Sequence, residues 1–355
     1  MHPLNFSRPA STHAARAREL ILPLRETLAN GLAACGIRSH GEVREGASHF
    51  WVEWLRDDGR HGGGNRQVWD RDEVFLSASL NFSQVHYDDL PDKALGSATA
   101  LSCIIHPNSP SAPSLHMHLS WTEMKDGGGS WRLMADLNPS IAIAEDTGTF
   151  NARMEQACDP RSGEARQRGD DYFFISPLKR HRGEAHYYFE RFMGATFDAG
   201  LAFVEGFGVA AIEAYVEILD RRILRANEPT NEQIVAQRSY HTLYLYQVLT
   251  LDRGTTSGLL VHDQNDEGVL GSLPPVVDVA LLESWASWTP KPQDELVLKL
   301  CEVLRAHPEG EVDAEKKTRF AEILRRHYAE HPEALGLQAG DSSGPLATTR
   351  HASES

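Results

Sequence analysis

Short alternations of apolar and polar residues, set between long helical patterns, constrain the fold of this chain most. In residues 115–121 every second residue is apolar, which is the pattern of a strand with one buried face. Residues 74–80 and 102–106 also have the composition of strands. Strands and helices do not alternate in a strict strand–helix–strand order, so antiparallel neighbours are expected. We therefore predict an α+β fold with an antiparallel sheet.

The N-terminal pattern predicts a long helix. Leucine recurs at every fourth position from Leu20 to Leu32, and Ser11 or Thr12 can cap the helix. Gly36 is placed to end it. Pro23 lies inside the pattern and predicts a kink or a split.

Further patterns continue to the C-terminus. Residues 204–222 predict a long helix, whereas residues 243–251 and 258–261 have the composition of strands. Residues 295–304 and 314–328 are amphipathic and predict two more helices.

Composition and charge exclude several classes of protein. Fifty acidic residues against 35 basic ones give a formal net charge of -15, which disfavours binding to nucleic acid. The most apolar helical pattern, residues 200–219, carries three glutamates, so we expect no membrane span. The four cysteines form no CxxC pair and are expected to be buried thiols. The N-terminus lacks an apolar signal core, and we predict a cytoplasmic protein.

Histidines on one strand offer the clearest candidate chemistry. His116 and His118 are two residues apart on a predicted strand, so their side chains share a face and can converge on one ligand or metal. His106 precedes them at the start of an HPNSP turn. A carboxylate, Asp136, stands just before another turn. Each residue alone could be structural, but the three histidines together favour a functional site.

Several other features allow both a functional and a structural interpretation. The basic run at residues 179–182 could bind carboxylates, or could simply be solvated. Asp252 could anchor a turn. Glu123 follows His116 and His118 in a pattern that resembles half of a cupin-type metal motif, suited to non-haem iron. The glycines of the predicted loop at residues 61–66 lack the GxxxxGK[ST] pattern of a phosphate loop.

A set of short motifs occurs in an order that resembles oxygen-dependent coproporphyrinogen III oxidases over about residues 45–305. Each motif is short, but their common order is specific. In chain order they are GGGNR at 62–66, NFSQV at 81–85, Ser102 with His106-Pro107, NSP at 108–110, Ala112-Pro113, His116, DLNP at 136–139, DDYF at 170–173, HRGE at 181–184, DRGT at 252–255, SLPP at 272–275 and WTPKP at 288–292.

The resemblance implies a large antiparallel sheet flanked by helices on both faces, and a homodimer. It implies oxidative decarboxylation of two propionates of coproporphyrinogen III to vinyl groups, which gives protoporphyrinogen IX in haem biosynthesis. O2 is the co-substrate and no flavin or haem is required. The resemblance makes residues 45–305 the coproporphyrinogen III oxidase-like domain. From the sequence patterns we expect residues 1–44 to be an N-terminal helical segment and 306–336 a helical extension, and residues 337–355, which are rich in glycine, serine and threonine, to be a disordered tail.

The resemblance also implies roles for individual residues. His116 is the proton-transfer residue and Asp136 faces the pyrrole nitrogens, with Asp252 as a further catalytic carboxylate. Substrate-binding residues are Ser102, His118, Arg182 and Arg253. A divalent metal would be held by His106, His116 and His181, or in the alternative iron site by His116, His118 and Glu123.

The chain departs from the family pattern at several positions. Ser120 stands where the family has an arginine, and residues 132–135 replace a triple glycine. Thr149 and Asn151 replace a His-x-His pair. Residues 263–265 align with a loop that carries an arginine in the family, and residues 185–188 replace an Arg-Gly and a glycine pair.

Two other functions therefore stay open. One is O2-dependent oxidation of a different, less anionic substrate on the same scaffold, with or without a metal. The other is a non-catalytic dimer that binds a tetrapyrrole.

Overall fold

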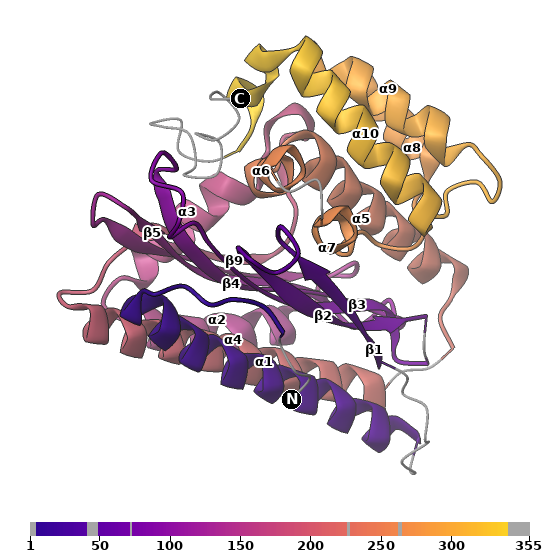
Figure 1. Ribbon diagram of the computed structural model, residues 1–355. Coiled ribbons are helices and arrows are strands. Elements are labelled where there is room, and N and C mark those ends of the chain that lie inside the picture. The colour runs from indigo at the N-terminus through magenta and orange to yellow at the C-terminus, as the bar shows by residue number, and fades with distance from the viewer. Residues whose placement is uncertain (1–4, 41–48, 72, 226–227, 262–264, 340–355) are drawn as a thin grey trace. The chain divides into compact units, whose positions relative to one another are not determined.

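A computed structural model describes residues 5–40, 49–71, 73–225, 228–261 and 265–339 (Figure 1). The chain divides into two compact units. Unit 1 contains Met1–Asp170 and Gly183–Pro229, and unit 2 contains Asp171–Arg182 and Thr230–Ser355. Unit 1 carries the large sheet, whereas unit 2 is mostly helical.

Unit 1 is built on a seven-stranded antiparallel sheet with the order β1-β2-β3-β4-β5-β6-β9. The strands are β1 His49–Leu55, β2 Gly62–Asp70, β3 Phe75–His86, β4 Leu95–Pro107, β5 Ser114–Met124, β6 Gly129–Asn138 and β9 Ala185–Phe192. The three strands predicted first correspond to β3, β4 and β5. Together with the helices that flank the sheet, this arrangement confirms the predicted α+β fold.

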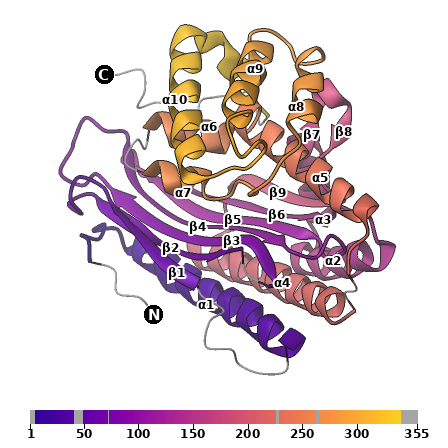
Figure 2. The same ribbon diagram turned by 90° about the vertical axis from the view of Figure 1, so that its right-hand side faces the viewer.

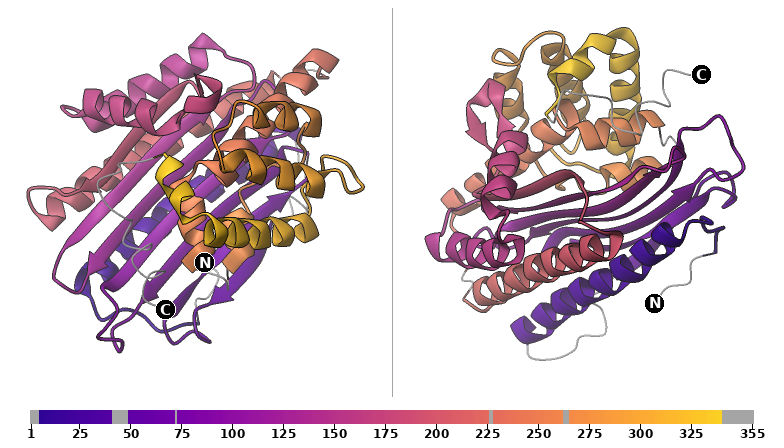
Figure 3. Two further views of the ribbon diagram at one scale, coloured as in Figure 1. Left: turned by 90° about the horizontal axis from the view of Figure 1, so that it is seen from above. Right: turned by 90° about the vertical axis from the view of Figure 1, so that its left-hand side faces the viewer.

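One face of the sheet forms the apolar core of unit 1. Helices α1 (Thr12–His40) and α4 (Phe197–Leu224) pack against this face and against each other, and α2 (Ala144–Cys158) packs beside α4 (Figures 2 and 3). One row of directly opposed residues on this face consists of buried Leu80, Cys103, Met117, Ala135 and Tyr187. Because strand side chains alternate between faces, the residues between them lie on the opposite face of the sheet.

Helix α1 runs through two residues that were predicted to interrupt it. Pro23 lies inside the helix without splitting it, and the helix continues beyond Gly36 to His40. Leu24, Leu28 and other apolar residues of α1 are buried in the core. Packing of this apolar face stabilises the helix enough to offset the backbone hydrogen bond that a proline removes.

Helix α4 has the length and composition of a membrane-spanning helix, and half of its most apolar window is buried in the protein. Val204, Phe207, Ile212 and Tyr215 from this helix belong to the core cluster of unit 1. Core helices of soluble proteins meet the same criterion. The packing of α4 under the sheet therefore accounts for its hydropathy.

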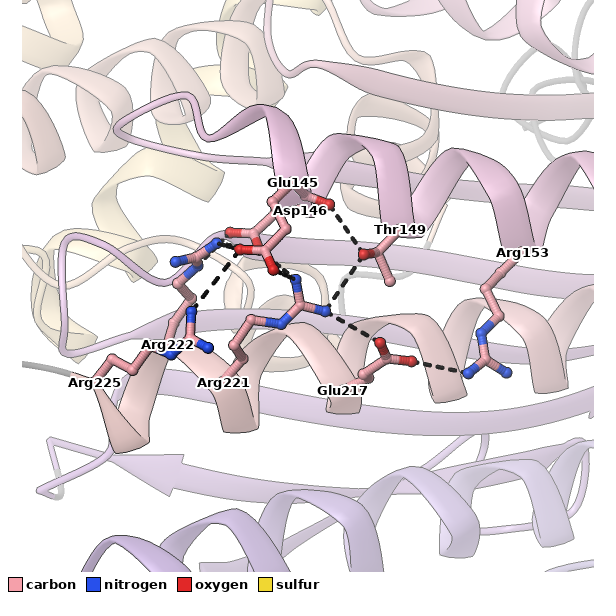
Figure 4. Close-up of polar contacts among 8 residues, drawn as sticks. All are labelled: Glu145, Asp146, Thr149, Arg153, Glu217, Arg221, Arg222 and Arg225. Atoms are coloured by element: carbon pink, nitrogen blue, oxygen red, sulfur yellow. Dashed lines mark hydrogen bonds and ion pairs between the residues drawn. The ribbon is translucent and has the colours of Figure 1, made fainter.

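Ion pairs join α2 to α4 (Figure 4). Asp146 is 2% exposed and accepts two hydrogen bonds of 2.7 Å from Arg222, one from Nε and one from Nη2. Arg221 lies 2.8 Å from Glu145 and 3.1 Å from Glu217. The bidentate Asp146–Arg222 pair is the buried centre of this network, whereas Glu145 and Glu217 are more exposed.

The glycine run predicted as a loop belongs to strand β2. A Cβ atom on Gly64 would lie 2.2 Å from the Phe82 carbonyl oxygen and 2.6 Å from Trp54 Nε1. A Cβ on Gly62, where φ is +97°, would lie 2.1 Å from the Gln84 carbonyl oxygen. The glycines are thus explained by close approach of neighbouring strands and not by a turn.

The four cysteines are buried thiols outside any disulfide, as predicted. Burial raises the pKa of Cys158 and of Cys301 to about 12. These thiols therefore stay protonated at neutral pH and are poor nucleophiles.

Unit 2 is a helical assembly. Its helices are α5 Asn231–Thr250, α6 Arg253–Val261, α7 Asp266–Leu270, α8 Val279–Ala286, α9 Gln293–Leu304 and α10 Ala314–Glu330, with a short 3₁₀ segment at Pro332–Leu337. The strands β7 (Phe174–Ile175) and β8 (Arg180–His181) form a small hairpin, and α3 (Ser162–Phe173) enters unit 2 at its last turn. Helices α9 and α10 confirm two sequence predictions.

The predictions of strands at residues 243–251 and 258–261 are wrong, because these residues lie in α5 and α6. Every residue from Tyr240 to Thr250 is buried. A helix that is buried on all sides shows no 3.6-residue period, so its sequence cannot be told from that of a buried strand. The missed signal lay upstream, where Thr230 and Gln233 form a capping box that starts α5.

The C-terminal tail was predicted to begin at residue 337. Within the described chain, Ala339 N–H donates to the Leu251 carbonyl oxygen at 2.8 Å, and Gln338 Nε2 donates to the Tyr328 hydroxyl at 2.9 Å. Gln338 and Ala339 are therefore hydrogen-bonded to other residues of unit 2. The remainder of the predicted tail lies outside the described residues.

Two buried histidines make the stability of unit 2 dependent on pH. Burial lowers the pKa of His241 and of His327 from 6.5 to about 4. His327 Nε2 lies 2.6 Å from Gln293 Oε1, so it donates this hydrogen bond, and Nδ1 is buried without an acceptor among the described residues. Protonation at Nδ1 would therefore bury a second N–H group with no partner.

We expect unit 2 to lose stability as the pH falls from 6.5 towards 4. Over this range the unfolded histidines bind protons that the folded ones do not, so the loss is at most about 3 kcal/mol for each. Urea unfolding between pH 7 and pH 4.5, followed by tryptophan fluorescence, measures the slope. A His327→Gln variant should have a shallower slope, whereas the same change at exposed His307 should leave it unaltered. An equal slope for His327→Gln and the wild type would contradict this prediction.

Candidate functional site

The second face of the sheet is polar. The registers place two adjacent rows of opposed residues on it, each crossing β3, β4, β5, β6 and β9. One row is Ser79, Ile104, His116, Asp136 and His186, and the next is Asn81, Ser102, His118, Met134 and Tyr188. The predicted site residues Ser102, His116, His118 and Asp136 therefore lie together on one face.

His116 and Asp136 are directly opposed on β5 and β6 and form a hydrogen-bonded pair. His116 Nδ1 lies 2.7 Å from Asp136 Oδ1. The Asp136 carboxylate is fully buried, and its second oxygen accepts a hydrogen bond of 2.6 Å from Asn138 Nδ2. The His116 side chain retains 15% exposure. Asp136 is thus held from two sides, while the His116 side chain keeps a small exposed fraction.

The pairing determines which ring nitrogen of His116 faces the carboxylate. With Asp136 ionised, its oxygens only accept hydrogen bonds, so the 2.7 Å contact is one in which His116 Nδ1 donates. The other ring nitrogen, Nε2, can then accept a proton and later return it, as in other carboxylate-oriented histidines. The pair can serve as a general base or acid for a ligand on the polar face.

The backbone at Gly183 passes close to the Asn138 side chain. A Cβ on Gly183 would lie 2.4 Å from Asn138 Oδ1 and 2.5 Å from the Leu137 carbonyl oxygen. Only glycine fits there, which explains the glycine of the HRGE motif. Because Gly183 has no side chain, the segment that leads into β9 can pass beside the end of β6. Asn138 can then keep its hydrogen bond to the Asp136 carboxylate.

His118 and Ser102 are directly opposed neighbours on β5 and β4. His118 Nε2 lies 3.0 Å from Ser120 Oγ, on the same face of β5. Both His118 and Ser102 are half-buried, so their polar groups reach the surface of the sheet. The prediction that His116 and His118 share a face is confirmed.

The predicted metal ligands are distributed differently. His106 is buried on the polar face, where its Nδ1 lies 3.0 Å from Ser114 Oγ. Its predicted partner His181 belongs to unit 2. Over the part of the chain that the structure describes, no group of three histidine, cysteine or carboxylate side chains could hold a metal ion.

The alternative iron set is not brought together. Glu123 is an odd number of residues from His116 and His118, so its side chain lies on the other face of β5. There it accepts hydrogen bonds from Ser11 and, at 3.4 Å, from Trp121 Nε1. The spacing of two residues correctly predicted that His116 and His118 share a face. The same alternation of side chains places Glu123 on the opposite face, away from both histidines.

Predicted site residues of unit 2 have structural contacts of their own. Asp252 accepts hydrogen bonds from the Tyr172 hydroxyl at 2.7 Å and from the Thr255 N–H at 2.6 Å, and so caps α6. Arg253 is the first residue of that helix.

Arg182 is buried in unit 2 between two aromatic rings. Its guanidinium carbon lies 4.4 Å from the Phe173 ring centroid and 5.0 Å from that of Tyr244. His181 is exposed on β8, with its ring 5.1 Å from that of Phe174.

Sequence reasoning missed a second histidine–carboxylate pair on the polar face. His186 is directly opposed to Asp136, and its Nδ1 lies 2.8 Å from Asp170 Oδ1. Gly169 packs against His186, with a Cβ position 2.6 Å from its carbonyl oxygen, which lets α3 bring Asp170 to β9. No local pattern connects these residues, so no sequence signal could have found the pair.

Two departures from the family pattern have structural explanations. Thr149 accepts a hydrogen bond of 3.3 Å from Arg221 within the α2–α4 network (Figure 4). Asn151 accepts one of 3.0 Å from the Tyr187 hydroxyl. The residues at the former His-x-His positions therefore hold helices and sheet together. Of the loop at residues 263–265, only Asn265 lies within the described residues.

The family resemblance was tested by comparison with known protein families. The sequence model described as coproporphyrinogen III oxidase matches residues 33–304. This range covers more than half of the chain and includes the whole sheet with the His116–Asp136 pair. The chain belongs to the coproporphyrinogen III oxidase family.

Proposed function

We propose that this protein catalyses the oxygen-dependent oxidative decarboxylation of coproporphyrinogen III to protoporphyrinogen IX. Family membership implies a coproporphyrinogen oxidase, an oxidoreductase that acts on a tetrapyrrole. The observation that best supports this assignment is the buried Asp136, hydrogen-bonded to a partly exposed His116 on a polar sheet face.

The proposed reaction converts each of two propionate side chains to a vinyl group. Written for one side chain R on a pyrrole, R–CH2–CH2–COO⁻ + O2 + H⁺ gives R–CH=CH2 + CO2 + H2O2. The carbon next to the ring loses hydrogen and the terminal carbon leaves as CO2, while the two electrons reduce O2. Proton transfer at the pyrrole or at the reacting side chain requires a group such as His116 Nε2.

In this proposal Asp136 orients His116 and stabilises its protonated form. Both carboxylate oxygens of Asp136 already accept hydrogen bonds, from His116 and from Asn138. We therefore assign Asp136 to positioning of the imidazole, in addition to the pyrrole contact that the resemblance implies. Ser102 and His118, on the neighbouring row, would contact the substrate.

Homodimer formation and a cytoplasmic location belong to the same proposal and rest on the resemblance and the sequence. So does the division into an N-terminal helical segment, a catalytic domain at residues 45–305 and a C-terminal extension. Light scattering of the purified chain measures the oligomeric state directly, and a mass of one chain would contradict the dimer.

The test is an aerobic incubation of purified protein with coproporphyrinogen III, followed by chromatography of the oxidised porphyrins. We expect the three-propionate and then the two-propionate product, with H2O2, and no product without O2. Conversion that continues without O2 would contradict the oxygen-dependent reaction. If folded protein gives no conversion in air, the substrate assignment is wrong and the less anionic alternatives become preferable.

A further inference from the structure

The C-terminal part of unit 2 lies outside the range that the family model matches, which ends at residue 304. Its described part contains α10 and the 3₁₀ segment at Pro332–Leu337. Helix α10 packs against α9, α7 and α6 (Figure 1). The chain therefore adds a helix of its own to α6, which begins within the DRGT motif, and to α7.

Helices α6 and α7 need support from outside. Helix α6 has nine residues, among them two glycines, two threonines and a serine, and α7 has five residues. Isolated helices of this length are marginal in water, and glycine and threonine are poor helix formers. A Cβ atom on Gly258 would lie 3.1 Å from Val269 Cγ2, so the two helices pack closely on each other. Their conformation therefore depends on tertiary contacts.

Arg325 of α10 joins the two helices. Its Nε donates to the Leu259 carbonyl oxygen at 3.0 Å, in the last turn of α6, where carbonyl oxygens have no N–H partner within the helix. Its Nη1 donates to Asp266 Oδ2 at 2.9 Å and its Nη2 donates to Asp266 Oδ1, at the first residue of α7. All three guanidinium nitrogens are thus used to hold α6 and α7 together.

The segment that follows α10 holds the other end of α6. Gln338 Nε2 donates to Thr256 Oγ1 at 2.5 Å, in the first turn of α6, where Thr256 is buried. The Ala339 N–H donates to the Leu251 carbonyl oxygen at 2.8 Å, and Ala339 forms a parallel bridge with Asp252. The C-terminal segment therefore contacts both ends of the helix that carries most of the DRGT motif.

We propose that Arg325 is a positioning residue for the reaction, because it bridges α6 and α7 and so fixes the helix that begins with Arg253. This inference rests on the proposed function, since the resemblance gives Asp252 and Arg253 their roles at the site. Asp252 has a further support in the Tyr172 hydroxyl, at 2.7 Å, whereas Arg253 is carried by α6 itself. Displacement of α6 therefore weakens substrate binding more than it slows the chemical step.

Steady-state turnover of coproporphyrinogen III by variants of the full chain tests this division. We expect Arg325→Ala to raise KM about 10-fold and to change kcat less than about 3-fold, because a small displacement of a binding group is costly even when the substituted residue is distant. Arg325→Lys should recover part of the loss, since it keeps the charge but not the planar set of donors. Arg326→Ala removes the same charge from the next, exposed position and should leave KM unchanged.

Two measurements do not need turnover. The affinity for coproporphyrin III, the stable oxidised form of the substrate, should weaken in Arg325→Ala by about the same factor as KM rises. In the protein without ligand, the amides of α6 should exchange hydrogen faster in Arg325→Ala, while those of the sheet in unit 1 keep the wild-type rate. Thermal melting of each variant reports whether it is folded.

A double-variant cycle shows whether Arg325 acts through its partner on α7. Asp266→Ala should also raise KM. The Arg325→Ala/Asp266→Ala double variant should raise it by less than the product of the two single effects, because the ion pair is removed only once.

The proposal is overturned if the wild type converts the substrate and Arg325→Ala has the same KM and the same affinity for coproporphyrin III. It is also overturned if Arg325→Ala lowers kcat and leaves KM unchanged, or if the amides of α6 exchange at the wild-type rate. These outcomes differ from failure of the proposed function, in which the folded wild type gives no product although Arg325→Ala still speeds the exchange of α6.

Discussion

An Asp136→Asn variant is expected to lose about 100-fold to 10,000-fold in kcat, while the protein stays folded. Asn138 Nδ2 donates to one oxygen of Asp136, so an asparagine there would keep its own oxygen towards Asn138. Its amide N–H2 would then face His116 Nδ1, which would have to accept a hydrogen bond. The imidazole proton would move to Nε2, and that nitrogen could no longer act as a base.

Steady-state oxidation of coproporphyrinogen III measures this loss, with His116→Ala as the companion variant. Both should lower kcat more than they change KM or the affinity for coproporphyrin III. Asp89→Asn is the matched control, because Asp89 contacts another histidine, His61, at 2.8 Å in a different part of unit 1. A loss of only a few fold in both variants would mean that the pair does not transfer a proton. If the wild type gives no turnover and both variants bind coproporphyrin III as tightly as the wild type, a passive tetrapyrrole carrier becomes the better explanation.

An Asp146→Ala variant is expected to lose about 3–5 kcal/mol of unfolding free energy. The Asp146 carboxylate is 2% exposed and is bonded on both oxygens to Arg222, which is itself mostly buried (Figure 4). Removal of the carboxylate takes away the buried partner of Arg222 and leaves the guanidinium its 2.9 Å contact with the more exposed Glu145. The mostly buried charge of Arg222 is then only partly compensated, and this contributes more to the destabilisation than the lost contact itself.

Urea unfolding at pH 7 measures this change. Glu145→Ala is the matched control, because Glu145 contacts the same arginines but its side chain is 54% exposed, so the loss of unfolding free energy should be much smaller than for Asp146→Ala. An Asp146→Leu/Arg222→Met double variant should recover part of the stability, because it removes both charges together. If Asp146→Ala and Glu145→Ala lose the same small amount, the pair contributes no more than a surface ion pair.

The strand alternation and the order of motifs predicted much of unit 1. Period-two alternation is imposed by the pleat, so the pattern at residues 115–121 identified a strand and placed His116 and His118 on one face. The same period places Glu123 on the other face of β5, so the iron site expected from His116, His118 and Glu123 contradicts the alternation of the strand. Family motifs then identified His116 and Asp136 before any distance was known.

Predictions from local patterns failed where burial on all sides removed the hydrophobic period. They also failed where the contacting residues are far apart in the sequence. Residues 243–250 are buried on all sides of their helix, and only packing in unit 2 distinguishes this helix from a strand. The glycines at residues 62–64 suggested a loop, although they are required by the close approach of β1 and β3. The α2–α4 ion pairs join residues that are 60 or more positions apart in the sequence.

The sequence by itself determined the strand faces, the main helices of unit 1, the buried cysteines and the family. Each of these depends on side chains that are close in the chain or on an ordered set of short motifs. Only the tertiary structure decided that Asn138 supports Asp136, that His186 pairs with Asp170, and that Arg325 joins α6 to α7. Those contacts depend on strand register and on helix packing, which join residues whose separation in the sequence carries no period that could predict them.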